Sequence, residues 1–329
     1  MLSRRPLNLS LRVAVSPHVN STVRRLSLNS IGMANSIKSS VRLYVILARN
    51  APKAVVFRRG SSKQVLLTLW HIDSDTFDEG QWLKGRIYER RCDLSPSGKF
   101  LIYFAANYKE PYFSWTAISK PPFLTALSLW QKGDGWGGGG LFKSESEILL
   151  NHRDDEMTLA DGFKLPKEIK IKPFGERPGW GEDSPILDTR LIRDGWNSIQ
   201  SGESIEHKLG APIWIEFNPP IVWSKLNPMR HDFELREAIN GLHERNGSWY
   251  ITEHLIVDKN SDETISLGKT DWADWDRNGE LLFAKDGKIF RLGFNENNKL
   301  NGLEEAKLLI DLSERKFEPK ETPSEFSAW

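Results

Sequence analysis

The most unusual stretch of the sequence is a glycine-rich run at residues 132–140, interrupted by one aspartate and one tryptophan. Four consecutive glycines lose much backbone entropy on ordering, so the chain there needs either positive φ angles or very close approach. One interpretation is a ligand-facing loop, in which the bare amides of Gly137 and Gly138 meet a ligand beside Asp134 and the indole of Trp136. The alternative is a tight crossing where only glycine avoids a clash. The run has neither the Lys-Ser/Thr end of a Walker loop nor a dinucleotide fingerprint.

Tryptophan is abundant in the middle of the chain. Its large apolar face and single N–H donor allow clusters of tryptophan to stack sugars, proline-rich peptides or bases. We therefore add Trp115 to the predicted ligand-binding set of Asp134, Trp136, Gly137 and Gly138. For any single tryptophan, packing between neighbouring sheets is the competing interpretation. The central tryptophans are Trp115, Trp130, Trp136, Trp180, Trp196, Trp214 and Trp223.

The other reactive residue types form no complete catalytic motif. The seven histidines include no His-x-x-x-His or His-Glu-x-x-His pattern, and no Gly-x-Ser-x-Gly elbow is present. Cys92 is the only cysteine, so no intramolecular disulfide can form, and we expect it to be a small buried hydrophobe. The sequence therefore predicts no catalytic residue, no metal site and no cofactor.

Carboxylates beside aromatic or glycine-rich turns leave a second interpretation open. A hydrolase acting on a glycan needs two carboxylates that face one cavity. Asp side chains in turns also cap the backbone of hairpins, which is the competing explanation. The carboxylates in question are Asp93, Asp134, Asp183 and Asp274.

The elements that would position these residues are short strands separated by turns. The clearest turn is Ser-Pro-Ser-Gly at residues 95–98, where proline fixes φ and Gly98 supplies a positive φ before a buried strand. A related turn ends at Gly279, and a weaker one contains Gly247. Such strands, at roughly 8–12-residue spacing and without intervening helices, indicate a sandwich, barrel or propeller.

These turns resemble the blade turn of WD40-like and TolB-type β-propeller repeats, a Ser-Pro-Asp-Gly-Lys hairpin followed by an apolar strand. The block at 114–122 and the glycine-rich run also resemble a family of uncharacterised bacterial proteins, which implies no activity. The first resemblance implies an all-β propeller or propeller-like fold of about five blades, with a few short helices in loops. No regular repeat can be laid over residues 110–240.

The sequence predicts one β-domain at residues 42–312 and an extended C-terminal tail at 313–329. Residues 233–243 are the best helical candidate, with a loop at the rim as the alternative, and residues 124–130 suit a strand or a short helix. Residues 1–41 form an N-terminal extension. Its first 32 residues hold five Arg, six Ser and no acid, so they suit a transit peptide, a disordered leader or an over-long start before Met33.

Composition narrows the classes of partner. The first acidic residue is Asp73, and from there on 33 basic and 44 acidic groups give a net charge of −11, which argues against nucleic-acid binding. No apolar run is long enough to cross a bilayer, and the cysteine content fits a reducing compartment. We therefore expect a cytoplasmic monomer.

Two functions from different classes remain after these exclusions. The first is a non-enzymatic module that binds an unknown protein or a small polar ligand. The alternative is a hydrolase that acts on a glycan or other polar substrate through carboxylates at the mouth of a channel. The hydrolase requires paired carboxylates in a deep pocket beside Trp136, whereas a binding module requires a shallow aromatic surface and no perturbed acids.

Overall fold

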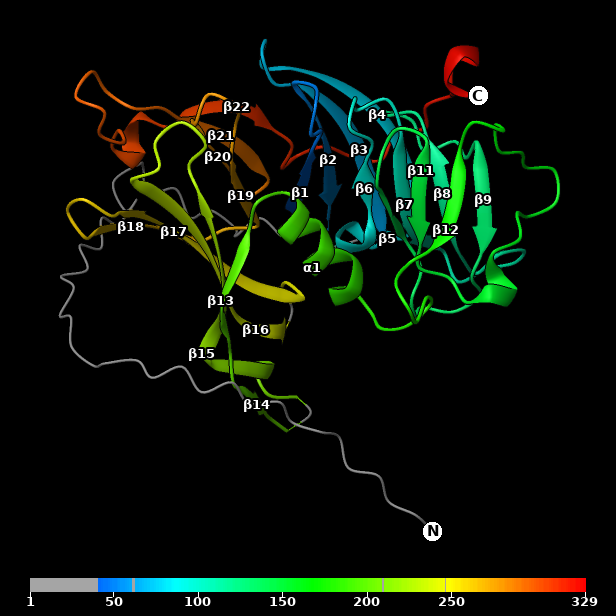
Figure 1. Cartoon of the computed structure of the whole chain (residues 1–329), viewed down its shortest axis with the longest axis horizontal. Helices are drawn as coiled ribbons and strands as arrows, with labels where there is room; N and C mark the ends of the chain where they lie inside the picture. The colour runs from blue at the N-terminus through cyan, green and yellow to red at the C-terminus, as the bar shows by residue number, and fades with distance from the viewer. Residues whose placement is uncertain (1–40, 61–62, 209, 246) are drawn as a thin grey trace.

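The computed structural model describes residues 41–60, 63–208, 210–245 and 247–329. The N-terminal segment, with its alternative interpretations, lies outside the described residues. The rest of the chain forms five β-sheets that follow one another in sequence order (Figure 1).

The first two sheets are antiparallel and include the hairpin expected after residue 55. The strands of the first sheet are β1 (Arg42–Leu47), β2 (Lys53–Arg59), β3 (Gln64–His71) and β4 (Thr76–Lys84). The strands of the second sheet are β5 (Arg86–Ile87), β6 (Asp93–Leu94), β7 (Leu101–Ala106), β8 (Ser114–Ser119) and β9 (Ser128–Gln131), with the short helix η1 (Glu89–Arg91) before β6.

The third sheet is small, and a helix separates it from the fourth. The third sheet and its neighbouring helices are β10 (Gly140–Phe142), β11 (Glu147–Leu150), η2 (Asp154–Glu156), β12 (Lys170–Pro173) and α1 (Ser184–Arg193). The fourth sheet comprises β13 (Asn197–Ser201), β14 (Ser204–Glu206), β15 (Ile213–Leu226), β16 (Phe233–Glu244), β17 (Tyr250–Asp258) and β18 (Glu263–Lys269). The fifth sheet and the remaining short helices are β19 (Trp272–Trp275), β20 (Leu281–Lys285), β21 (Lys288–Leu292), η3 (Leu303–Glu305), β22 (Lys307–Asp311) and η4 (Ser324–Phe326).

Neighbouring sheets contact one another near a common axis. Strand β1 contacts both β6 and β19, and β6 contacts β10. Helix α1 packs on β10 and η1, and lies between the third and fourth sheets (Figure 1). Sheets that succeed one another around an axis define an all-β, propeller-like fold. This confirms the predicted fold class.

Apolar clusters of described residues join four pairs of neighbouring sheets. Phe57 of the first sheet packs with Leu101 of the second, and Ile102 of the second packs with Phe142 of the third. Similar clusters join the first sheet to the fifth and the fourth to the fifth. Burial of these faces is the main favourable contribution to folding.

The two predicted glycine turns occupy equivalent places. Gly98 (φ 72°) lies in the β6–β7 hairpin, and Gly279 (φ 76°) lies in the β19–β20 hairpin. Each turn packs on a hairpin loop of the preceding sheet: the amide of Asn50, between β1 and β2, donates to Pro96 O at 2.8 Å, and Asn227 Nδ2, between β15 and β16, donates to Gly279 O at 2.8 Å. The turn pattern predicted that the bends at Gly98 and Gly279 would have similar surroundings in their two sheets.

The predicted helix at residues 233–243 is wrong, because this segment is the central strand β16, and it is not a rim loop either. It is hydrogen-bonded to β15 on one side and to β17 on the other. A bulge between Ile239 and Gly241 breaks the two-residue alternation, which is why the apolar spacing imitated a helical period. The one α-helix among the described residues, α1, was not predicted. Of residues 124–130, the last three belong to strand β9.

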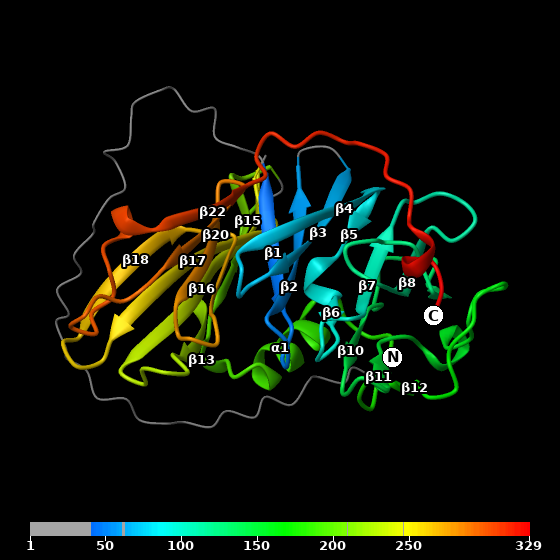
Figure 2. The same ribbon diagram turned by 90° about the horizontal axis from the view of Figure 1, so that it is seen from above.

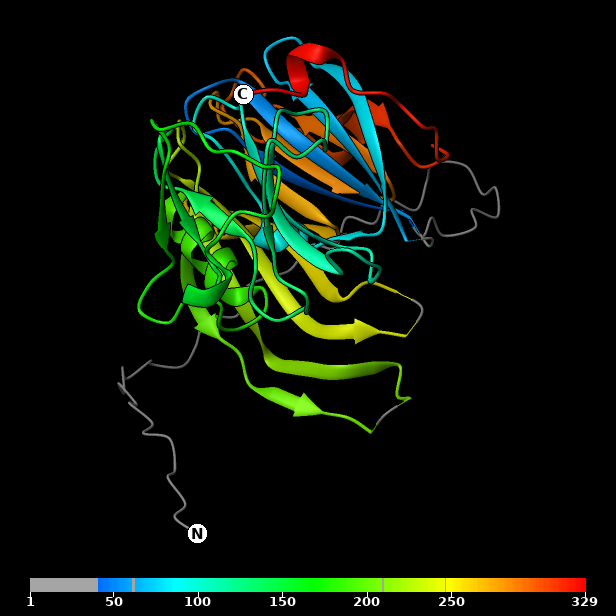
Figure 3. The ribbon, with the colours of Figure 1, turned by 90° about the vertical axis from the view of Figure 1, so that its right-hand side faces the viewer.

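The C-terminal tail runs across the first two sheets (Figure 2). The ring of Phe317 lies 6.0 Å from that of Trp82, and Phe326 lies 4.7 Å from Phe123. Trp329 Nε1 donates to Lys164 O at 2.9 Å. Figure 3 shows the tail lying over the outer strands. Within the described chain, no helix is both long and apolar enough to cross a membrane.

Candidate functional site

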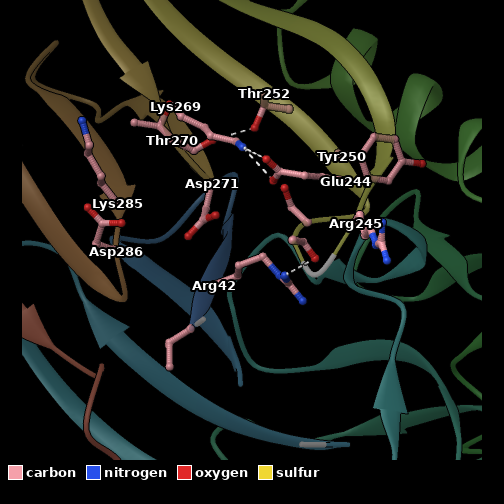
Figure 4. A pocket seen from close by; sticks show the side chains of 13 residues that line it. Arg42, Glu244, Arg245, Tyr250, Thr252, Lys269, Thr270, Asp271, Lys285 and Asp286 are labelled. Carbon is pink, nitrogen blue, oxygen red and sulfur yellow. Dashed lines mark hydrogen bonds and ion pairs between the residues drawn. The ribbon is translucent and has the colours of Figure 1, made fainter. Parts of the chain in front are cut away.

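A pocket of about 460 Å³ opens at the end of the axis where β1 and β19 begin (Figure 4). We call it the axial pocket. Its walls come from the start of β1 and from the connections between β16 and β17, β18 and β19, and β20 and β21. It is lined by Val41, Arg42, Glu244, Arg245, Gly247, Ser248, Tyr250, Thr252, Lys269, Thr270, Asp271, Lys285 and Asp286.

Asp271 is the most perturbed acid of the axial pocket. Its backbone N–H donates to Ala284 O at 3.0 Å, and its Oδ2 accepts a hydrogen bond from the amide of Leu43 at 3.1 Å, which joins the fifth sheet to the first. Burial raises the pKa of Asp271 to about 7, and the negative charges of Asp286 and Glu89 add to the rise. The carboxyl group therefore exchanges a proton near neutral pH and can both donate and accept hydrogen bonds.

Cations surround this carboxyl group. Arg42 Nη1 donates to Gly247 O at 2.8 Å, and burial together with the charge of Arg59 lowers the pKa of Arg42. Lys269 pairs with Glu244 at 2.6 Å, and Lys285 Nζ donates to Leu267 O at 2.9 Å (Figure 4). The surroundings of the half-buried Arg42 guanidinium disfavour its charge, so an added anion would stabilise the charged form.

The strands behind the pocket carry an ordered set of polar side chains. Thr252 Oγ1 donates to Thr270 O at 2.6 Å, and Thr270 Oγ1 lies 2.7 Å from Nδ1 of the buried His254. Burial lowers the pKa of His254 to about 4, so the imidazole is neutral at physiological pH. These bonds fix the wall of the pocket without adding charge to it.

Arg90 lies deeper along the axis, where side chains from three sheets meet. Its guanidinium lies 3.5 Å from Glu237 and stacks over the rings of Tyr250, at 3.9 Å, and Tyr44, at 5.3 Å. Burial disfavours the charge on Arg90, but Glu237 and the neighbouring acids hold its pKa above the usual range. The pair thus places a compensated cation beneath the axial pocket.

A second cavity, of about 500 Å³, lies on the other side of Asp271, towards the ends of β1 and β19. Lys225 and Asp274 form an ion pair of 2.7 Å there, and Arg193 holds Asp93 through two hydrogen bonds of 2.6 and 2.9 Å. These charges are already paired, but Arg49, which also lines this cavity, has a buried Nε without a hydrogen-bond partner among the described residues.

Of the five residues predicted to bind a ligand, four lie together in the glycine-rich run and Trp136 lines a pocket, whereas Trp115 is separate. Trp115 lies in β8 with 9% of its surface exposed and packs in the core. Asp134 accepts hydrogen bonds from Lys132 Nζ and from the amide of Trp136, both at 2.9 Å. Trp136 is 49% exposed and lines a small pocket of about 290 Å³.

Gly137 forms a tight crossing with the chain after the third sheet, and Gly138 forms one with the segment that follows β11. Their φ angles are 68° and 81°, and their amides donate to Gly181 O at 2.7 Å and to Asn151 O at 2.8 Å. A Cβ on Gly138 would lie 2.5 Å from the ring of Phe104. The geometry of both glycines is accounted for by packing, and both amides have protein partners.

Sequence reasoning missed the residues that form the axial pocket. Arg42, Tyr250 and Asp271 belong to three different sheet segments, and none is part of a recognisable motif. The only local signal is that Asp271 stands directly before the first strand of a sheet, where a side chain must face the axis. In the part of the chain that the structure describes, no group of three or more His, Cys, Asp or Glu side chains could hold a metal ion.

The fold and the axial pocket define the protein as an all-β, propeller-like chain with a charged pocket on its axis. No protein-family model and no curated protein sequence matches it. Among solved structures, the β-propeller domain of the Trilobed protease from Pyrococcus furiosus is similar at 11% identity and a TM-score of 0.27, with 84% of this chain and 99% of that chain covered. A putative 6-phosphogluconolactonase from Bacteroides fragilis is similar at 11% identity and a TM-score of 0.31, with 85% and 98% covered. The fold assignment rests on the order of the sheets.

Proposed function

We propose that the protein is a binding module whose axial pocket takes a small polar ligand carrying an anionic group. The observation that carries this proposal is the placement of Arg42 beside Asp271 at the mouth of the axis. Arg42 supplies a positive charge that neighbouring carboxylates do not fully balance. Asp271 supplies a carboxyl group that can donate a hydrogen bond when protonated.

The charges of the other lining residues support the same ligand chemistry. Arg245 and Lys285 add positive charge at the rim, while Lys269 is neutralised by Glu244. An anion would therefore meet its strongest attraction near Arg42. Because Asp271 loses its proton as the pH rises through about 7, the affinity for an anion should fall over the same range.

Calorimetric titration with small carboxylates and phosphate monoesters tests this function. We expect Arg42→Gln to weaken binding by roughly tenfold or more, and Asp271→Asn to remove the loss of affinity above pH 7. Arg315→Gln is the matched control, since Arg315 is a half-exposed arginine paired with Glu79 far from the axis. Binding that survives Arg42→Gln unchanged would place the ligand elsewhere.

Hydrolysis is the second candidate, and the perturbed pKa of Asp271 is the observation that favours it. An acid with a pKa near 7 suits general acid–base catalysis at neutral pH. The test is a panel of chromogenic glycosides, esters and lactones. We expect a rate with an inflection near pH 7 that Asp271→Asn abolishes. No turnover by the wild-type protein on any of them would leave binding as the function.

A WD40-like or TolB-type kinship, a monomeric state, a cytoplasmic location and the absence of nucleic-acid and membrane partners stay predictions from the sequence. So does a ligand-binding role for Trp115, Asp134, Gly137 and Gly138.

A further inference from the structure

The small pocket beside Trp136 has features of a second binding site. Its volume of about 290 Å³ is near the lower end of the range for small-ligand sites. We call it the aromatic pocket, and its main lining residues are Arg86, Tyr88, Trp136, Glu182, Asp183 and Trp249. They come from the second sheet, the glycine-rich run, the start of α1 and the β16–β17 connection.

The cation of the aromatic pocket has no protein counter-charge. Arg86 Nε is buried, and among the described residues it has no hydrogen-bond partner and the guanidinium forms no ion pair. The guanidinium stacks 4.3 Å from the centre of the Tyr88 ring, which fixes its plane. A buried N–H without a partner is costly, so a ligand oxygen bound here would recover that cost.

The neighbouring arginine does not compete for such a ligand. Arg91 donates to Asp183 Oδ1 at 2.6 Å and to the carbonyls of Gly135 and Gly137 at 2.7 and 2.6 Å. Asp183 Oδ2 in turn accepts a hydrogen bond from Tyr250 OH at 2.9 Å. The guanidinium of Arg91 is thus already paired with a carboxylate and two carbonyls, which leaves Arg86 as the cation that can bind an anion in this pocket.

The exposed indole of Trp136 lines the pocket, and Trp180, outside the lining, packs against it. Trp136 is 49% exposed and Trp180 is 63% exposed, and their rings meet edge to face at 6.4 Å. Large aromatic surfaces left in solvent are unfavourable unless a partner covers them. A flat ring with C–H groups on its face suits such an indole, and Glu182, which is exposed, can accept hydrogen bonds from hydroxyl groups.

We propose that the aromatic pocket binds a sugar ring that carries a carboxylate, a uronic acid residue, with its face on Trp136 and its carboxylate on Arg86. A nucleobase would stack on the indole but brings no carboxylate for Arg86. An acidic peptide side chain would bring the carboxylate but no ring face for Trp136. The uronic acid satisfies both groups at once.

This site is distinct from the axial pocket, although the two share a wall. A narrow cavity of about 50 Å³ lies between them and is lined by Trp249, Tyr250 and Arg90 among others. The inference therefore does not depend on the proposed function of the axial pocket.

Titration of the full chain with D-glucuronate, followed by tryptophan fluorescence and calorimetry, tests the assignment. We expect saturable binding, with D-glucose at least tenfold weaker because it lacks the charge for Arg86. Trp136→Ala should abolish the fluorescence change, and Arg86→Gln should erase the preference for glucuronate over glucose. Trp82→Ala and Arg315→Gln are the matched controls, since both residues lie outside the pocket and Trp82 packs on Phe317 of the C-terminal tail.

The outcomes separate the two sites. Asp271→Asn should leave the glucuronate-induced fluorescence change unchanged, because that change reports Trp136 in the aromatic pocket. Loss of the change in that variant but not in Trp136→Ala would assign the sugar to the axial pocket and overturn the inference. Tighter binding of N-acetyl-aspartate than of glucuronate would overturn it in favour of an acidic peptide. Circular dichroism of Arg86→Gln establishes that a loss of binding is not a loss of fold. Should that variant prove unfolded, Arg86→Lys keeps the charge but not the planar fork, and it should retain part of the preference.

Discussion

The raised pKa of Asp271 makes the stability of the protein depend on pH in a direction that one substitution can reverse. In the folded protein the pKa is about 7, against 3.8 for the free side chain. A carboxyl group with a raised folded-state pKa contributes stability that is complete below its unfolded pKa and is lost as the pH rises through its folded pKa. Asp271 should therefore destabilise the native state progressively from about pH 4 to pH 8.

The size of this effect follows from the shift. Each pKa unit corresponds to about 1.4 kcal/mol, so a shift of about three units gives at most about 4 kcal/mol. Because Asp271 is partly exposed in the axial pocket, solvent screening should reduce this to roughly 2 kcal/mol. In Asp271→Asn the amide oxygen can still accept the bond from Leu43, and the charge is gone.

Urea unfolding of both proteins at pH 5 and pH 8 measures the effect. We expect Asp271→Asn to gain about 2 kcal/mol of stability relative to the wild type between the two pH values. Comparing the two proteins at each pH cancels the contribution of every other titrating group. A stability difference that is the same at both pH values would refute the assignment of a raised pKa to this carboxyl group.

Two further predictions concern packing along the axis. Gly138→Ala should lower the free energy of unfolding by roughly 3 kcal/mol in a urea titration, because its Cβ would overlap the ring of Phe104. Gly162→Ala has a similar φ of 84° but lies in open space, so it should lower the free energy of unfolding by only about 1 kcal/mol. Equal losses in the two variants would show that backbone strain alone matters there. Glu237→Gln should destabilise the protein by about 3 kcal/mol, because it leaves Arg90 buried without its counter-charge. The double variant Arg90→Met with Glu237→Leu should recover much of that loss of stability in thermal unfolding. If the double variant recovers nothing, the ion pair is not the source of the lost stability.

The sequence by itself determined the features that depend on a few neighbouring residues. The turns at Gly98 and Gly279 were predictable because a positive φ next to a buried strand is a local requirement that glycine meets at no steric cost. The tight crossing at Gly138 was one of two open interpretations for the same reason. The repetition of these turns was enough to indicate a propeller-like fold.

Tertiary structure alone decided the features that depend on partners far away in the sequence. Strand β16 kept its extended form because β15 and β17 supply hydrogen bonds on both sides, which outweighs a helix-like spacing of apolar residues. Asp271 acquired its pKa from burial against the first sheet, more than 200 residues away in the chain. Arg86 likewise met Trp136 only when the second sheet and the glycine-rich run packed together. A pocket assembled at the axis of separate sheets leaves no pattern in any one of them, because each contributes side chains that are separated in sequence and whose neighbours are fixed by the packing.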